Sequence, residues 1–309
     1  MWQRSCLVML TLVSAAQLRV EVRKSEVWLV RDGQESQLTH DAKAKPQAVL
    51  SPARDRIAYY EECPEAEHCM PAVVILDLEG HRITSFEPKR QSLPLPEPCA
   101  SILSIVWASE HAVGAECHIN PSTSEYIETD VSTGQVTRDL LGFDFVPSPD
   151  GKHVAHVGWM PHFSPPPYHS WYLQIDRITV YPLPQGMSPV EQKNASMPPN
   201  VIQQRGQTYA GIHEFASSLF WSPDSERVAC IDCTYDWTAN SPMFSSAGDG
   251  TESNRHCLLA IVSVSGKVVL FPLTDIGLNS DGGDKQLSWT GSHQLTLRLL
   301  DVTRTFDVP

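Results

Sequence analysis

Histidine supplies the first side chains that could do chemistry. The chain has 309 residues and 12 histidines, and a run of them is closely spaced: His153, His156, His162 and His169. Imidazole is the commonest metal ligand in proteins. His153 and His156 are three apart in an expected strand, so they face opposite sides and cannot share a metal. His162 and His169 share a loop where His118 or His256 could join them. We interpret these residues as separate surface histidines, and we predict no metal site and no cofactor.

The eight cysteines raise the question of redox or zinc chemistry. Cys230 and Cys233 form a C-x-x-C string, but sites of that type need a helix start or a knuckle. This string lies in an expected strand, where residues three positions apart point to opposite faces of the sheet. In an oxidising compartment the cysteines after the N-terminus could form up to three bridges and leave one free thiol. We predict two pairs, Cys63 with Cys69 and Cys233 with Cys257, and spacing alone leaves the connectivity open.

Carboxylates are plentiful, among them Glu61, Glu62, Asp77, Glu116, Asp232 and Asp236. Glycoside hydrolysis needs two carboxyl groups on opposite sides of one bond, and no spacing in the sequence selects such a pair. The sequence also contains no G-x-S-x-G, no P-loop and no H-E-x-x-H motif. We therefore name no catalytic residue.

Aromatic side chains form the most suggestive group. Residues 158–171 read GWMPHFSPPPYHSW, a proline-stiffened loop, and two further aromatics follow the C-x-x-C string. Exposed aromatics on a rigid loop make effective contacts with proteins or sugars. The alternative is that they pack over the loop and bury it. The predicted binding residues are Trp159, His162, Phe163, Tyr168, His169, Trp171, Tyr235 and Trp237.

An internal repeat indicates which elements position these segments. Three copies centre on Ser51-Pro52, Ser148-Pro149 and Ser222-Pro223, and two weaker copies centre on Trp107 and Trp289. Each strong copy has an apolar strand, a Ser-Pro turn and a second strand of alternating apolar residues. Proline fixes φ, and Asp or Gly suits the turn positions that follow. Each copy therefore predicts a β-hairpin.

A second kind of hairpin alternates with the first, over residues 26–39, 73–86, 126–140, 172–183 and 258–273. The order begins with the second kind and ends with the first, as in a ring whose last blade contains both termini. Such closure removes exposed sheet edges. We expect an all-β β-propeller over residues 17–309, with about five blades of four strands, closed by N- and C-terminal strands sharing one blade. A pair of β-sandwiches or an open, incomplete propeller is the alternative.

The Ser-Pro-Asp-Gly turn at residues 148–151, followed by a Val-Ala strand, resembles the repeat of the TolB-like (PD40, WD40-like) β-propeller family. The resemblance extends over most of the chain. The copy around Trp107 lacks Ser-Pro, Trp289 is followed by Thr-Gly, and the Gly-His and Trp-Asp marks of WD40 repeats are absent. The resemblance implies the fold and does not imply the role of TolB itself.

The N-terminus and the charge indicate a compartment and exclude one class of partner. Arg4, an apolar run from Cys6 to Val13 and the small residues Ser14-Ala15-Ala16 predict a signal peptide over residues 1–16. A strand or an incomplete gene start is the alternative. The run is too short to span a membrane. The net charge of −13 disfavours nucleic acid. We expect a periplasmic or secreted protein.

The distribution of chain length suggests where function lies. In a propeller, turns within hairpins lie on one face and connections between hairpins lie on the other. The extra length falls between hairpins, over residues 60–71, 87–98, 118–125, 158–170, 184–213, 233–257 and 274–284. Elaborated loops on a regular scaffold are the usual place for binding. We predict a non-enzymatic binding or scaffold propeller with a protein partner. A glycan or small ligand, a glycan hydrolase and a propeller accessory to a separately encoded peptidase are the alternatives.

Overall fold

The computed structural model describes residues 18–63, 69–91, 96–120, 123–158, 170–182, 205–240, 250–273, 285–299 and 302–309. The signal peptide expected over residues 1–16 lies outside them. All the regular elements described are β-strands. Within these ranges no helix is long and apolar enough to cross a membrane.

The strands pair antiparallel in six sheets, which we call A to F in chain order. Sheet A contains β1 (Leu18–Arg23), β2 (Glu26–Arg31) and β3 (Gln34–Gln37). Sheet B contains β4 (Ala48–Leu50), β5 (Arg56–Glu61), β6 (Ala72–Asp77) and β7 (Arg82–Phe86). Sheet C is the short ladder of β8 (Lys89–Arg90) and β9 (Glu97–Pro98).

Sheet D is the largest, with seven strands. They are β10 (Ile102–Trp107), β11 (Ala112–Asn120), β12 (Thr123–Asp130), β13 (Val136–Pro147), β14 (Val154–Gly158), β15 (Leu173–Ile175) and β16 (Ile178–Tyr181). Sheet E contains β17 (Thr208–Phe215), β18 (Phe220–Trp221), β19 (Arg227–Ala239), β20 (Gly250–Ser263) and β21 (Val268–Pro272). Sheet F contains β22 (Lys285–Gly291), β23 (Gln294–Leu299) and β24 (Val302–Asp307).

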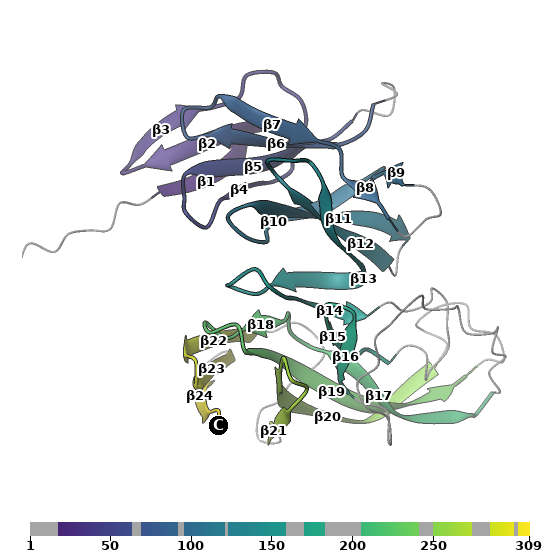
Figure 1. The fold of residues 1–309 in the computed structure, drawn as a ribbon. Coiled ribbons are helices and arrows are strands. Elements are labelled where there is room, and N and C mark those ends of the chain that lie inside the picture. The colour runs from purple at the N-terminus through teal and green to yellow at the C-terminus, as the bar shows by residue number, and fades with distance from the viewer. Residues whose placement is uncertain are drawn as a thin grey trace, which may run out of the picture.

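The sheets follow one another in an arc, with A at one end and F at the other (Figure 1). Apolar clusters fill the spaces between successive sheets. One joins A to B, a second joins B to the first half of D, a third joins the second half of D to E, and a fourth joins E to F. The central strands of sheets B, D and E are therefore buried on both faces. This explains the nearly continuous apolar run of β6.

Sheet D departs from a four-stranded unit because β13 belongs to two groups of strands. Residues 136–142 of this strand pair with β12, and residues 142–147 pair with β14. Gly142, at the changeover, has φ of 155° and lies against the backbone of Val157, where a side chain has no room. One unbroken strand therefore connects the hairpin expected over residues 126–140 with the turn expected at Ser148-Pro149.

The Ser-Pro repeat produces the same turn three times. The backbone N–H of Ser51, Ser148 and Ser222 donates to the carbonyl five residues later, at 2.8 Å in each case. The serine hydroxyl accepts the N–H of that same later residue, at 3.0 Å in each case. The third residue after the serine has a left-handed φ, with 61° at Arg54, 70° at Gly151 and 63° at Ser225. The hydroxyl closes the turn from inside, which explains why a buried serine recurs there.

A tryptophan links successive sheets at three junctions. The indole N–H of Trp107 donates to the carbonyl of Val49, that of Trp221 to Val146, and that of Trp289 to Phe220. Trp221 directly precedes the repeat serine Ser222. Trp107 and Trp289 occupy the equivalent position in the two weaker copies. Each acceptor lies two residues before the serine of the preceding repeat. The weak copies at Trp107 and Trp289 thus keep the contact between sheets even though they lack Ser-Pro.

Among the described strands, the first and the last belong to different sheets, so the expected closure by one shared blade is not shown. β1 pairs with β2 along all six of its residues, from Leu18↔Arg31 to Arg23↔Glu26. At the other end β24 pairs with β23. Leu18, Val20 and Val22 alternate with charged residues, so this stretch forms a strand that the hairpin count omitted. Each terminal hairpin therefore completes its own three-stranded sheet.

Candidate functional site

The largest departure from a regular sheet is an arm at one end of sheet E. β19 and β20 have 13 and 14 residues and continue as a hairpin well past their neighbour β21, which pairs β20 only from Leu258 onward. We call this arm the part of β17, β19 and β20 that lies at and beyond the Cys233–Cys257 disulfide: residues 208–214, 233–239 and 250–257. Residues 233–257 were expected to be a loop, and residues 233–239 and 250–257 are strand.

Three disulfides are present: Cys63–Cys69, Cys99–Cys117 and Cys233–Cys257. The first and third are the pairs expected from the sequence. Cys233 and Cys257 face each other directly across the ladder, with their Cα atoms 4.0 Å apart. Cys230 is a free, buried thiol. It points into the cluster between D and E, whereas Cys233 points into the cluster between E and F, so the C-x-x-C thiols do diverge.

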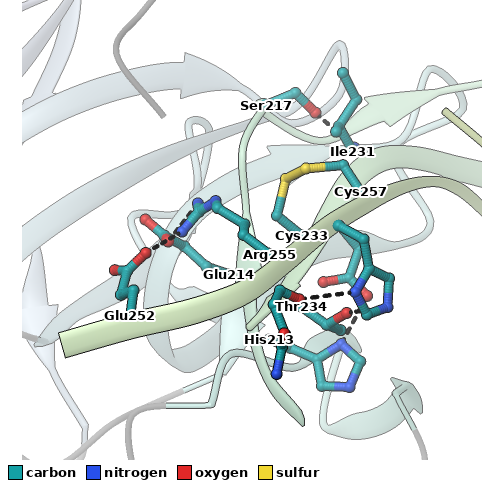
Figure 2. The surroundings of a disulfide bond; sticks show 12 residues. His213, Glu214, Ser217, Ile231, Cys233, Thr234, Glu252, Arg255 and Cys257 are labelled. Atoms are coloured by element: carbon teal, nitrogen blue, oxygen red, sulfur yellow. Dashed lines mark hydrogen bonds and ion pairs between the residues drawn. A yellow bond between two sulfur atoms is a disulfide. The ribbon is translucent and has the colours of Figure 1, made fainter. Parts of the chain in front are cut away.

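One face of the arm is aromatic. Tyr209, Ile212, Tyr235 and Trp237 form a small cluster with Ala239. Figure 2 shows the disulfide beside an ionic group, in which Arg255 reaches both Glu214 and Glu252. The distances are 2.8 Å to Glu214 and 3.0 Å to Glu252, and the guanidinium lies 5.2 Å from the ring centre of Tyr235. Aromatic packing and ion pairs therefore order the arm in addition to the disulfide.

The other face of the arm is polar. His213, Thr234 and His256 lie side by side across the three strands. The hydroxyl of Thr234 and Nε2 of His256 are 2.7 Å apart. Farther along β19 on the same face, Asp236 accepts hydrogen bonds from Asn254 and from the N–H of Gly211. Among the described residues no group of three or more His, Cys, Asp or Glu is arranged to hold a metal.

A buried carboxylate anchors the base of this polar face. Asp232 is completely buried, and its Oδ2 lies 2.6 Å from the Tyr181 hydroxyl and 2.7 Å from Nδ1 of His213. A carboxylate on Nδ1 fixes the tautomer and orientation of an imidazole, as in the acid–base half of hydrolytic triads. In the described part of the chain, no hydroxyl or thiol is hydrogen-bonded to Nε2 of His213. The arrangement joins sheets D and E, since Tyr181 belongs to β16.

Burial and neighbouring charges fix the protonation of these groups. Burial, reinforced by Glu214 and Glu252, raises the pKa of Tyr235 to about 12. Burial and the nearby Asp232 hold the pKa of Tyr181 well above its usual range, so the phenol keeps its proton and donates it. Hydrogen bonds from Asn254 and Gly211 lower the pKa of Asp236. These hydrogen bonds stabilise the ionised carboxylate of Asp236.

The structure describes three of the predicted binding residues, and all three are buried or half-buried. Trp237 is only 5% exposed, because strand alternation turns it into the aromatic cluster and over Gly250. Tyr235 is half-buried under Arg255. Trp171 packs edge-on against Phe143 and Phe215 in the cluster between D and E. The described surroundings of these rings are packing contacts, and their role in binding stays a prediction. The other five lie outside the described residues: Trp159, His162, Phe163, Tyr168 and His169.

The sequence contained a signal for the residues that were missed. In the stretch Val228 to Asp232, the even positions point into an apolar cluster, and Asp232 continues that series. A carboxylate at a core position of a strand requires buried partners. His213 and Tyr181 are far from it in sequence, so pattern alone could not have identified them.

Removing the Cys233–Cys257 bridge is expected to lower the free energy of unfolding by about 3 kcal/mol, because it closes a loop of 24 residues. The variant is Cys233→Ala/Cys257→Ala, measured by urea unfolding. The matched control is Cys63→Ala/Cys69→Ala, whose six-residue loop predicts a loss smaller by about 1 kcal/mol. Equal losses from both variants would contradict an entropic origin.

Comparison with solved structures finds β-propellers. The β-propeller domain of the Trilobed protease from Pyrococcus furiosus gives a TM-score of 0.43 at 10% identity, covering 94% of this chain and 77% of that chain. Putative TolB from Agrobacterium tumefaciens gives 0.38 at 10% identity, covering 82% and 76%. TolB from Acinetobacter baumannii gives 0.34 at 16% identity, covering 81% and 61%. No family model and no curated protein matches the sequence. In its described residues the chain is all-β, and its antiparallel sheets are similar to those of these β-propeller structures.

Proposed function

We propose that the chain is an exported, non-enzymatic binding or scaffold protein with a β-propeller fold, and that the arm of sheet E binds a protein partner. The observation that carries the proposal is the arm itself. It extends two strands beyond the sheet that the core requires, and a disulfide, an ionic group and an aromatic cluster hold it in shape. A rigid projection lowers the ordering cost of binding.

The outer edge of β20 supplies a surface for that contact. β21 pairs with β20 only at residues 258–262, so in the described structure residues 250–256 have no strand on that side. Thr251, Glu252, Ser253 and Asn254 are exposed there. Polar edges of this kind resist indiscriminate pairing and favour specific partners.

The three disulfides suggest an oxidising, extracytoplasmic environment, where such an arm would meet other exported proteins. This agrees with a periplasmic or secreted location.

The test places a photo-crosslinking amino acid at Thr251 on the arm, in the protein of residues 17–309. The matched control places it at Ser265, which is exposed in the turn between β20 and β21 at the opposite end of sheet E. Both proteins are irradiated in an envelope extract, and the adduct is identified by mass spectrometry. We expect one protein captured at Thr251 and not at Ser265.

The captured protein is then purified, and its affinity is measured for the wild type and for Ser253→Lys, at an exposed position outside the Arg255–Glu252 ion pair. Loss of affinity in this variant, with an unchanged melting temperature, supports the arm as the contact surface. Capture at both positions, or an affinity that does not respond to the arm, would contradict the proposal.

A further inference from the structure

A groove of about 780 Å³ lies between sheets B and D, away from the arm. One wall is β7 with the residues that follow it, and the opposite wall is the end of β12 with the turn into β13. The volume is in the range of sites that hold small ligands or short peptides. The polar lining residues are Arg82, Ser85, Glu87, Lys89, Gln91, Thr129 and Gln135.

The charge of the groove is opposite to that of the protein. Arg82 and Lys89 are both exposed along it, with Glu87 as the acidic lining residue. The whole chain carries a net charge of −13. A locally cationic groove in an acidic protein favours an anionic ligand.

The walls of the groove are rigid. Glu125 is completely buried and accepts the backbone N–H of Gln91 at 2.7 Å and Nε of Arg90 at 3.2 Å. This buried carboxylate fixes β8, and with it the backbone that carries Lys89. Hydrogen bonds to a buried side chain therefore hold this wall of the groove in position.

A buried hydroxyl in the lining lacks a partner. Thr129 is 2% exposed, and among the described residues its Oγ1 has no hydrogen-bond partner. An unsatisfied buried polar atom costs free energy unless a ligand or water completes it. Its position in the groove wall makes a bound ligand the natural partner.

The shape of the other wall favours a peptide. β7 is the last strand of sheet B, so among the described strands its outer edge is unpaired. A bulge at Ile83 leaves residues 84–86 as the regular part of that edge. Strand edges bind extended peptides through main-chain hydrogen bonds. Phe86 is the aromatic lining residue and packs against the core between B and D, so it offers no open ring face for a sugar.

We propose that this groove binds an extended acidic peptide segment. The segment adds a short strand to β7 at residues 84–86, its carboxylates pair with Arg82 and Lys89, and it supplies the missing partner of Thr129. The site is separate from the arm and does not depend on the function proposed for it.

The probe is a fluorescein-labelled octapeptide of four Glu-Thr repeats, titrated into the protein of residues 17–309 and followed by anisotropy. Comparison peptides carry Lys in place of Glu, or N-methyl groups on alternate backbone nitrogens. We expect binding of the acidic peptide, and weaker binding of both comparison peptides. Hydrogen–deuterium exchange is expected to show new protection at residues 84–87.

Arg82→Glu and Lys89→Glu are each expected to weaken binding about fivefold, whereas Lys267→Glu, in an exposed turn of sheet E, leaves it unchanged. Thr129→Val keeps the shape of the side chain and is expected to weaken binding about threefold without lowering the melting temperature.

Three results would overturn the proposal: no binding of the acidic peptide at millimolar concentration, equal binding of the Lys and Glu peptides, or tighter binding of a chito-oligosaccharide probe. An unchanged affinity of the N-methylated peptide would overturn the strand addition. Because none of these peptides reports on capture at Thr251, failure here is distinguishable from failure of the arm.

Discussion

Replacing Trp221 with alanine is expected to lower the free energy of unfolding by about 3–5 kcal/mol. The ring is 8% exposed and belongs to the cluster between sheets D and E. Its indole N–H donates to the carbonyl of Val146 at 2.7 Å, and the His153 ring stacks on it with centroids 6.4 Å apart. The substitution removes a large apolar side chain and a hydrogen bond at one junction, and urea unfolding measures the loss.

Trp221→Phe separates the hydrogen bond from the packing. It keeps an aromatic ring in the cluster but leaves the carbonyl of Val146 without its donor, so we expect a loss of about 1–2 kcal/mol. The matched control is Trp28→Phe in sheet A, where the ring is half-buried and Arg23 lies 5.6 Å from its centre. That variant is expected to change stability by less than about 0.5 kcal/mol.

If Trp221→Phe and Trp28→Phe were equally stable, the indole–carbonyl bond would contribute nothing to the junction. The recurrence of the bond at Trp107 and Trp289 would then reflect packing alone. A second measurement on Trp289→Phe decides this, because its acceptor, Phe220, lies in sheet E rather than D.

The repeat predicted from the sequence corresponds closely to the structure wherever the physics is local. The hairpins at Ser51, Ser148 and Ser222 form where expected because a serine hydroxyl, a proline and a left-handed residue act within six positions of one another. The alternation of apolar residues also identified strands whose side chains fill the clusters between sheets. These features need no knowledge of distant segments.

Features that depend on distant pairing were predicted less well. The strand at Leu18–Arg23 was not predicted. Alternation of apolar residues can indicate a strand, but it cannot show which strand is its partner, and that pairing decides whether the two termini share a sheet. The continuity of β13 across two groups of strands was hidden for the same reason. Closure of a ring is a long-range property, and the count of hairpins alone did not determine it.

The candidate site shows the same division. The position of Cys233 and Cys257 at the two ends of one long insertion suggested their pairing, and the structure places them directly opposite each other on β19 and β20. The composition of the stretch suggested a loop with exposed aromatics. Strand alternation instead places Trp237 in a cluster and Asp236 on the polar face. Which face an aromatic occupies depends on register, and the bulge after Thr234 alters that register.

Asp232 is the residue whose loss we expect to loosen the contact between sheets D and E and the base of the arm together. Asp232→Ala leaves the Tyr181 hydroxyl and Nδ1 of His213 without an acceptor, and the Asp232 side chain is completely buried. An orphaned buried donor costs about 1–3 kcal/mol, and because Tyr181 is buried and His213 is half-buried we expect a loss of about 2–3 kcal/mol in the free energy of unfolding. Tyr181→Phe, which removes one donor and leaves the other, is expected to cost about 1 kcal/mol.

The matched control is Asp236→Ala, four residues along the same strand and on the same face. Asp236 also accepts two hydrogen bonds, but it is only half-buried, so water can replace it and we expect a loss below about 0.5 kcal/mol. A double-mutant cycle between Asp232→Ala and Tyr181→Phe measures the coupling directly. Additive losses would show that the two side chains act independently. A coupling above about 0.5 kcal/mol would show that the buried carboxylate holds β16 of sheet D against β19 of sheet E, and therefore that the arm projects from a joint that spans two sheets.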